Sequence, residues 1–207
     1  MKTSNQVDNQ MNSKDFELIK SSVAAIISVI DPDASAETKT NTPTRVANFY
    51  KDMMATRSCE VNATHFQSSE YNGIILLSDI PFCSMCEHHM LPFFGTVHVG
   101  YIPSQSQSSN KKSSVIGLSK IPRIVNQCAA GLQMQERLTT EIAKKIEIET
   151  DADGVCVFIN AEHMCIRMRG VNKVDVKTTT HFETGSFKTE PANKRQMMNM
   201  LNVFCKR

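Results

Sequence analysis

The spacing of apolar residues changes along this chain, and that change limits the possible folds more than any other feature. Between residues 14 and 56 apolar side chains recur at steps of three and four, which is typical of amphipathic helices. From Ile74 the period shortens to two, and in residues 93–102 alternate side chains share one face of a predicted strand. Helical spacing returns in residues 119–150 and near the C-terminus. This order predicts an α+β fold, with a mainly antiparallel sheet and helices on one face.

Composition divides the chain into three parts without any internal repeat. Residues 1–13 are rich in Asn, Gln and Ser and are predicted to be a disordered N-terminal tail. Residues 14–56 form a helical extension, whose second helix is predicted to begin at Thr42-Pro43, a capping side chain followed by proline. Residues 57–207 form the main domain. The hydrophobic fraction of 41% is sufficient for a folded core.

Charge and hydropathy exclude several classes of protein. The formal net charge of +2 gives no reason to expect binding to nucleic acid or to an anionic membrane. The sequence contains no apolar run of about 18 residues, as a membrane helix requires. The first fifteen residues are polar and do not resemble a signal peptide, so we expect a cytoplasmic protein. Seven cysteines in a reducing compartment point to metal binding or chemistry and not to a disulfide framework.

Two segments carry residues that bind metals. Cys86 and His89 are three residues apart and can reach one metal from a single turn. A strand is predicted over residues 164–171. Its odd positions, together with the residue before it, would share one face that carries His163, Cys165, Arg167 and Arg169. Its apolar even positions are expected to be buried: Met164, Ile166 and Met168.

Cys86, His89 and Cys165 would provide three ligands of the type that zinc prefers, and a fourth position would stay open to water. That arrangement is typical of catalytic zinc, and the flanking His88 and His163 would then transfer protons. Two other interpretations stay open. Cys83 or His88 could complete a closed structural site, and the two arginines could lie on the solvated face of an edge strand.

A second cluster is basic and lies where a helix is predicted to begin. Ser119 precedes Lys120 and Arg123, whose positive charges oppose the helix dipole unless an anion lies between them. With Arg169 they would form a polyphosphate site, although a basic helix start on the surface is an equally simple interpretation. A role of Gln135-Glu136 in recognising a base edge does not follow from spacing.

Together, these segments resemble the GTP cyclohydrolase I family. The matching stretches occur in the order of the family and span about residues 40–187: N-T-P-T-R-V-A at 41–47, S-M-C-E-H-H-M-L-P-F-F-G at 84–95, G-L-S-K at 117–120 with R-I-V at 123–125, Q-M-Q-E-R-L-T at 133–139, M-R-G-V at 168–171 and K-T-T-T at 177–180. The S-x-C-E-H-H and Q-E-R-L-T runs are specific to the family.

The resemblance implies a tunnelling fold (T-fold) for the catalytic domain over residues 57–207, in an allosteric homodecamer made of two pentamers with active sites between subunits. It implies zinc bound to Cys86, His89 and Cys165. The implied reaction converts GTP and water to 7,8-dihydroneopterin triphosphate and formate, the first step towards folate or tetrahydrobiopterin.

The resemblance also implies roles for individual residues. His163 would protonate the purine ring nitrogen next to carbon 8, while His88 would serve the sugar rearrangement with Ser119. Glu136, helped by Gln135, would recognise guanine. Four basic residues would hold the triphosphate: Lys120, Arg123, Arg169 and Arg45.

The chain departs from the family in three places. Asn48 stands where many members have lysine, the 103–114 loop is longer than usual, and the match is loose after Phe187. Two alternatives to this function are another T-fold enzyme, such as the nitrile reductase of queuosine synthesis or a pterin synthase, and a zinc-stabilised assembly subunit without catalysis. The presence of both His88 and His163 argues against the second alternative.

Overall fold

The structure is a computed structural model that describes residues 11–62, 64–67, 71–104 and 114–204. Most of the predicted tail and of the 103–114 loop therefore lies outside the described residues. The chain forms two compact units, residues 1–59 and residues 60–207. In the described part of the chain, no helix has the length and apolar character needed to cross a bilayer.

The first unit is a pair of helices. Helix α1 (Ser13–Ile30) begins after Asn12, whose side chain accepts a hydrogen bond from the Asp15 backbone N–H at 2.9 Å. It ends at Asp31, as the following proline predicts. Helix α2 (Ala36–Ser58) packs against α1 within this unit.

The predicted start of the second helix at Thr42-Pro43 is wrong. Helix α2 already begins at Ala36, because the Ser35 side chain accepts a hydrogen bond from the Thr38 backbone N–H at 3.1 Å. Pro43 lies inside the helix, where it cannot donate a backbone hydrogen bond. Two capping signals compete here, and the earlier one, Ser35, begins the helix.

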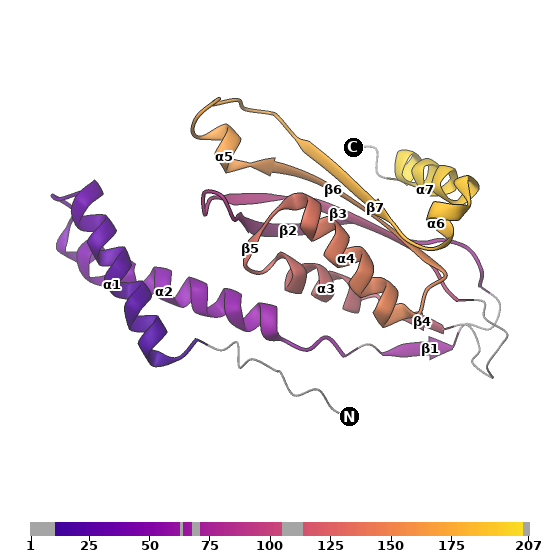
Figure 1. Cartoon of the computed structure of the whole chain (residues 1–207), viewed down its shortest axis with the longest axis horizontal. Coiled ribbons are helices and arrows are strands. Elements are labelled where there is room, and N and C mark those ends of the chain that lie inside the picture. Colours follow the sequence, from indigo (N-terminus) through magenta and orange to yellow (C-terminus); the bar gives the residue numbers. More distant parts are fainter. Residues whose placement is uncertain (1–10, 63, 68–70, 105–113, 205–207) are drawn as a thin grey trace. The chain divides into compact units, whose positions relative to one another are not determined.

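The second unit is built on a five-stranded sheet of order β5-β2-β3-β6-β7 (Figure 1). Its strands are β2 (Ile75–Cys86), β3 (Pro92–Ile102), β5 (Leu132–Gln133), β6 (Gly154–His163) and β7 (Thr178–Glu183). All neighbouring pairs are antiparallel except β2 and β5. Two short strands, β1 (His65–Gln67) and β4 (Ser114–Ile116), form a separate antiparallel pair.

Helices α3 (Lys120–Ala129) and α4 (Gln135–Thr150) cover one face of this sheet. Their apolar side chains meet the alternate residues of β3 that the two-residue period predicts to be buried. These strand residues are all inaccessible to solvent: Phe93, Val97, Val99 and Tyr101. Leu138, Ile142 and Ile146 of α4 are equally buried. The predicted α+β class with a mainly antiparallel sheet is confirmed, and its two long helices lie on one face; two further helices near the C-terminus lie on the other.

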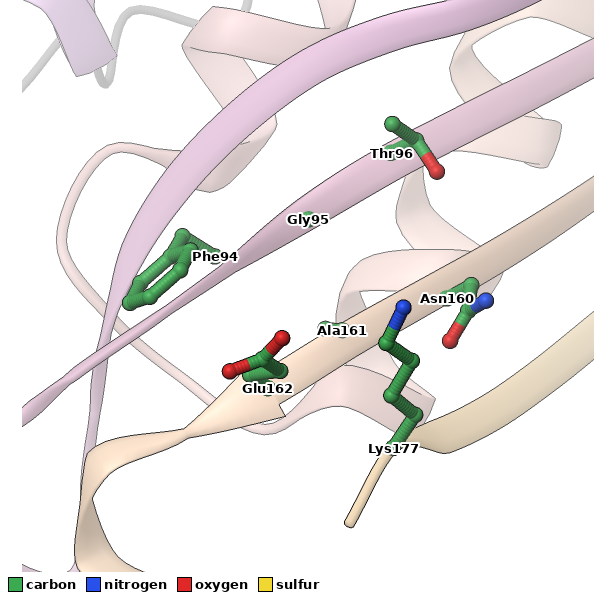
Figure 2. Close-up of a pocket in the computed structure, with 7 residues that line it drawn as sticks. All are labelled: Phe94, Gly95, Thr96, Asn160, Ala161, Glu162 and Lys177. Atoms are coloured by element: carbon green, nitrogen blue, oxygen red, sulfur yellow. The ribbon is translucent and has the colours of Figure 1, made fainter. Parts of the chain in front are cut away.

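The opposite face of the sheet is covered at one end only. Helices α6 (Ser186–Thr189) and α7 (Pro191–Phe204) pack there, with Met197 against Ile102 and Cys156. Further along this face lies an open pocket of about 130 Å³ (Figure 2). Its lining comes from β3, β6 and the residue before β7, and includes Phe94, Thr96, Asn160, Glu162 and Lys177. None of the residues predicted for the functional site lines this pocket.

The strand predicted over residues 164–171 is wrong. Strand β6 ends at His163, and the chain turns into the short helix α5 (Met164–Arg167). The ladder ends here because β3 begins at Pro92, which has no N–H to donate to the next residue of β6. The expected burial of the even positions also fails, since Met168 is 62% exposed.

Candidate active site

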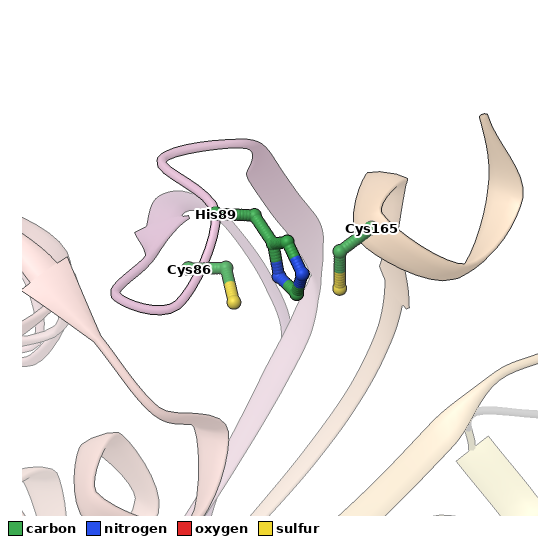
Figure 3. Close-up of side chains that lie close together, drawn as sticks. All are labelled: Cys86, His89 and Cys165. Carbon is green, nitrogen blue, oxygen red and sulfur yellow. The ribbon is translucent and has the colours of Figure 1, made fainter. Parts of the chain in front are cut away.

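A tight turn between β2 and β3 forms one side of the site. Cys86 ends β2, and its carbonyl accepts hydrogen bonds from the backbone N–H groups of His89 (3.4 Å) and Met90 (2.8 Å). Met90 has a φ of 52°, which closes the turn. The Cys86 N–H donates to the Leu91 carbonyl at 2.8 Å. This local geometry folds the His89 side chain back towards the Cys86 sulfur (Figure 3).

Helix α5 brings Cys165 to the same place. One ligand atom from each of Cys86, His89 and Cys165 lies within 4.8 Å of the other two (Figure 3). Burial and the nearby Cys86 thiol raise the pKa of the Cys165 thiol, while Arg169 acts in the opposite direction. Two thiols and an imidazole at this separation suit a cation that accepts sulfur and nitrogen ligands. Among the described residues, the group includes neither Cys83 nor His88.

His163, at the end of β6, lies in a defined environment. Its ring stacks on Phe93 with a centroid distance of 4.7 Å and an interplanar angle of 3°. Its Nε2 lies 2.8 Å from Oε1 of Gln135. Burial lowers the pKa of His163, and the carboxylate of Glu136 opposes that shift. The ring is therefore held by two neighbours, and a negative charge lies close to it.

Gln135 begins α4 and is only 2% exposed. Its Nε2 donates to the carbonyls of Ile159 (3.2 Å) and Thr178 (2.9 Å) and to Oγ1 of Thr180 (3.1 Å). Both ends of the amide are thus bonded inside the chain. The predicted contact of Gln135 with a base would have to compete with these bonds, whereas the neighbouring Glu136 is exposed.

His88 lies in a more open environment on the turn. Its side chain is 60% exposed, with Nδ1 at 3.9 Å from the Cys86 sulfur and Nε2 at 3.7 Å from Glu87. Glu87 in turn forms an ion pair with Arg137 of α4 at 2.5 Å. The sequence analysis missed the roles of Glu87 and Arg137. The available signal was their opposite charge inside the two most specific runs, C-E-H-H and Q-E-R-L-T.

The basic residues are distributed around the site. The guanidinium of Arg169 lies 2.5 Å from Nε2 of His89, while Arg167 pairs with Glu162 and so does not share its environment. At the start of α3, Ser119, Lys120 and Arg123 are exposed or half-buried, and the Ser119 side chain does not cap the helix. Within the described residues, no hydrogen bond or ion pair connects these three to the Cys86 group.

Arg45, the fourth predicted phosphate ligand, belongs to the first unit. It is exposed and pairs with Glu37 at 2.7 Å, and this pairing lowers the pKa of the Glu37 carboxyl. Asn48 lies in the same unit, beside a cavity lined by residues of both α1 and α2.

One protein family matches most of this chain. The family model described as GTP cyclohydrolase I matches residues 19–202. This chain belongs to the GTP cyclohydrolase I family. The family resemblance drawn from the S-x-C-E-H-H and Q-E-R-L-T runs is thereby confirmed.

Individual relatives within the GTP cyclohydrolase I family are similar over nearly their whole length. GTP cyclohydrolase 1 of Lactiplantibacillus plantarum is 40% identical, over 92% of this chain and 98% of its own. GTP cyclohydrolase 1 of Thermoanaerobacter pseudethanolicus is 42% identical, over 91% and 97%. Among solved structures, an archaeosine synthase QueF-Like in the apo form matches with a TM-score of 0.42 and 16% identity, over 56% of this chain and 97% of its own.

Proposed function

We propose that this chain is a GTP cyclohydrolase I, which converts GTP and water to 7,8-dihydroneopterin triphosphate and formate. The observation that carries the proposal is the group of Cys86, His89 and Cys165, with ligand atoms within 4.8 Å of each other and histidines on both sides. Membership of the family supports the same conclusion.

The metal of this site is proposed to be zinc. Two thiols and one imidazole are a typical zinc ligand set, and three protein ligands are the number found in catalytic zinc sites. Zinc bound there would activate water near neutral pH and act as a Lewis acid. Arg169 beside His89 fixes the orientation of that imidazole and adds positive charge at the edge of the site.

Proton transfer is assigned to the two histidines that are not ligands. His163 has a ring fixed by Phe93 and Gln135, and we propose that it protonates the purine nitrogen next to carbon 8. We assign the later sugar rearrangement to His88, whose side chain is 60% exposed, together with the Ser119 hydroxyl, which makes no helix-capping hydrogen bond.

Substrate binding is assigned to exposed charged groups. The Glu136 carboxylate lies close enough to His163 to affect its pKa, so a guanine bound to Glu136 would have its ring beside His163. We assign the triphosphate to four basic residues: Lys120, Arg123, Arg169 and Arg45. Because the triphosphate is kept in the product, these contacts provide binding energy and orientation only.

We further propose that the active enzyme is an allosteric homodecamer in the cytoplasm. Strand β7 is an outer strand of the sheet, and a free strand edge can pair with another chain. Four exposed apolar side chains lie together in the sequence just before it: Met168, Val171, Val174 and Val176. A site between subunits would also explain why Ser119, Lys120 and Arg123 have no bond to the metal ligands within one chain.

A turnover assay with GTP tests the proposal. Formate release and, after oxidation, neopterin fluorescence are followed before and after a chelator removes the metal. We expect both products to disappear on chelation and to return with zinc. Consumption of NADPH without formate would indicate a reductase instead, and zinc-loaded protein that forms no product would contradict the proposed activity.

A further inference from the structure

We propose that Gln135 is the positioning residue of His163. Its amide oxygen accepts a hydrogen bond from Nε2, so that the neutral imidazole is held with its proton on Nε2. This inference rests on the proposed function. It replaces a role of Gln135 in base recognition with a role in orienting the acid.

The hydrogen bonds of Gln135 fix the orientation of its amide. Three acceptors surround Nε2, and two of them are the backbone carbonyls of Ile159 and Thr178, which cannot donate. The nitrogen end must therefore face these carbonyls. The oxygen end then points to His163, where Oε1 lies 2.8 Å from Nε2.

A pair of threonines keeps this amide in place. The Thr139 hydroxyl donates a hydrogen bond to the backbone carbonyl of Gln135 at 2.7 Å. The same hydroxyl oxygen lies 2.7 Å from the hydroxyl oxygen of Thr180. Thr180 accepts from Gln135 Nε2 at 3.1 Å and so has its own proton free for Thr139. Every hydrogen bond in this network then has one donor and one acceptor. If the amide were flipped, its oxygen would face two carbonyl oxygens, which cannot donate.

The tautomer of His163 follows from the amide. An amide oxygen only accepts, so Nε2 of His163 must carry a proton in the neutral ring. Among the described residues, Nδ1 has no hydrogen-bond partner. Stacking on Phe93 favours the observed plane of the ring, and a half-turn within that plane would replace Nε2 by a ring carbon and break the hydrogen bond to Gln135.

Because Gln135 is buried, its role in positioning His163 can be distinguished from a role in binding substrate. Its side chain is 2% exposed and its two polar atoms are already bonded, whereas Glu136 is exposed. Loss of the amide should therefore reduce the chemical step and leave the affinity for GTP unchanged.

Kinetics of Gln135→Met test the inference, since methionine keeps the length of the side chain without its hydrogen bonds. We expect kcat to fall about 10- to 100-fold, less than the roughly 10²- to 10⁴-fold loss expected when the general acid itself is removed, and the KM for GTP to change less than about threefold. In a His163→Ala background, the same substitution should cause no further loss. Thr180→Val, a milder change that leaves Gln135 in place, should lower kcat in the same direction by a smaller factor.

A spectroscopic measurement tests the tautomer without turnover. Solid-state NMR of the whole protein, labelled with ¹⁵N in histidine rings, should show His163 with a protonated Nε2 and an unprotonated Nδ1. The resonance is assigned by its loss in His163→Ala. In Gln135→Met the two tautomers should both be populated, with unchanged metal content.

Three results would overturn the inference. They are a rise of KM at constant kcat, independent losses from the Gln135 and His163 substitutions, and a wild-type ring that carries its proton on Nδ1. A wild-type protein that does not convert GTP contradicts the proposed function, and the NMR result still decides the tautomer in that case.

Discussion

The two histidines assigned to proton transfer lie in contrasting parts of the site. His163 stacks on Phe93 and bonds to Gln135, so that packing and a buried hydrogen-bond chain determine its position. His88 lies on a turn with a side chain that is 60% exposed, 3.7 Å from a carboxylate oxygen of Glu87, which is itself paired with Arg137. One side of the site is complete within the chain, whereas the other is open. On the proposed mechanism, His163 would therefore be preorganised for the first proton transfer, whereas the environment of His88 would be completed by a second chain or by substrate.

Of all the substitutions considered, loss of a metal ligand should reduce turnover of GTP the most. In Cys165→Ser the site loses one of two thiols, and we expect turnover of GTP to fall about a thousandfold or more, since a bound metal contributes several kcal/mol to the transition state. Zinc content measured by atomic emission should fall with it. Cys128→Ser provides the control, because Cys128 is a buried cysteine outside the group. Full turnover in a zinc-free Cys165→Ser protein would contradict the ligand assignment.

Substitution of the two histidines should separate the steps of the reaction. His163→Ala should lower formate release about 10²- to 10⁴-fold, as expected for a lost general acid. His88→Ala should release formate but form little neopterin product, because its proposed role follows ring opening. Both products are measured in the same reaction. If formate release fell equally in the two variants, the assignment of His163 and His88 to different steps would be contradicted.

Substitution of Arg137 tests whether the ion pair between Glu87 and Arg137 of α4 contributes to the role of His88. In Arg137→Met the Glu87 carboxylate loses its partner, and we expect neopterin formation to fall about threefold to tenfold, which corresponds to about 1 kcal/mol for an exposed charge pair. Arg137→Lys should recover part of this loss at low salt. Thermal unfolding serves as the control, because Arg137 also donates hydrogen bonds to Oε1 of the buried Gln133 and to the Leu132 carbonyl, and a loss of stability must be separated from the kinetic effect. Unchanged kinetics would show that Glu87 holds His88 without help.

The smallest expected effect concerns His98, a half-buried histidine on the opposite face of the sheet. Burial lowers the pKa of His98 below its usual value of 6.5, and its Nδ1 accepts a hydrogen bond from the Asp79 backbone N–H at 3.2 Å. As the pH falls below 6.5, the unfolded chain takes up this proton before the folded one does, so acid lowers the free energy of unfolding. His98→Asn keeps an acceptor but does not titrate. Its unfolding free energy, measured with denaturant at pH 7.5 and 5.5, should fall less than that of the wild type.

Much of the fold could be predicted, because the spacing of apolar residues within a segment is sufficient to identify a helix or a strand and its buried face. The alternation in residues 93–102 identified the buried face of β3, and the four-residue steps identified the core residues of α4. Two boundaries could not be predicted in this way. Ser35 competes with Thr42 as a cap, and the end of β6 depends on Pro92 in its partner strand, a pairing that is absent from the sequence of either segment alone.

The candidate metal ligands could be predicted from the sequence, whereas the residues that position the other site side chains could not. The spacing of Cys86 and His89 follows from the needs of a metal, and the structure brings Cys165 to them even though the strand expected to carry it is a helix. Their binding of zinc stays a prediction. The position of Gln135 against His163 depends on contacts between residues 28 apart, which no local pattern reveals.

X-ray absorption at the zinc edge tests the central claim most directly. The account predicts one zinc per chain with two sulfur ligands at about 2.3 Å, one imidazole nitrogen at about 2.0–2.1 Å and one light atom from solvent. Cys165→Ser should lose one sulfur or the metal. A zinc with three or four sulfur ligands, or with a closed set of protein ligands that includes His88, would contradict an open catalytic site at Cys86, His89 and Cys165.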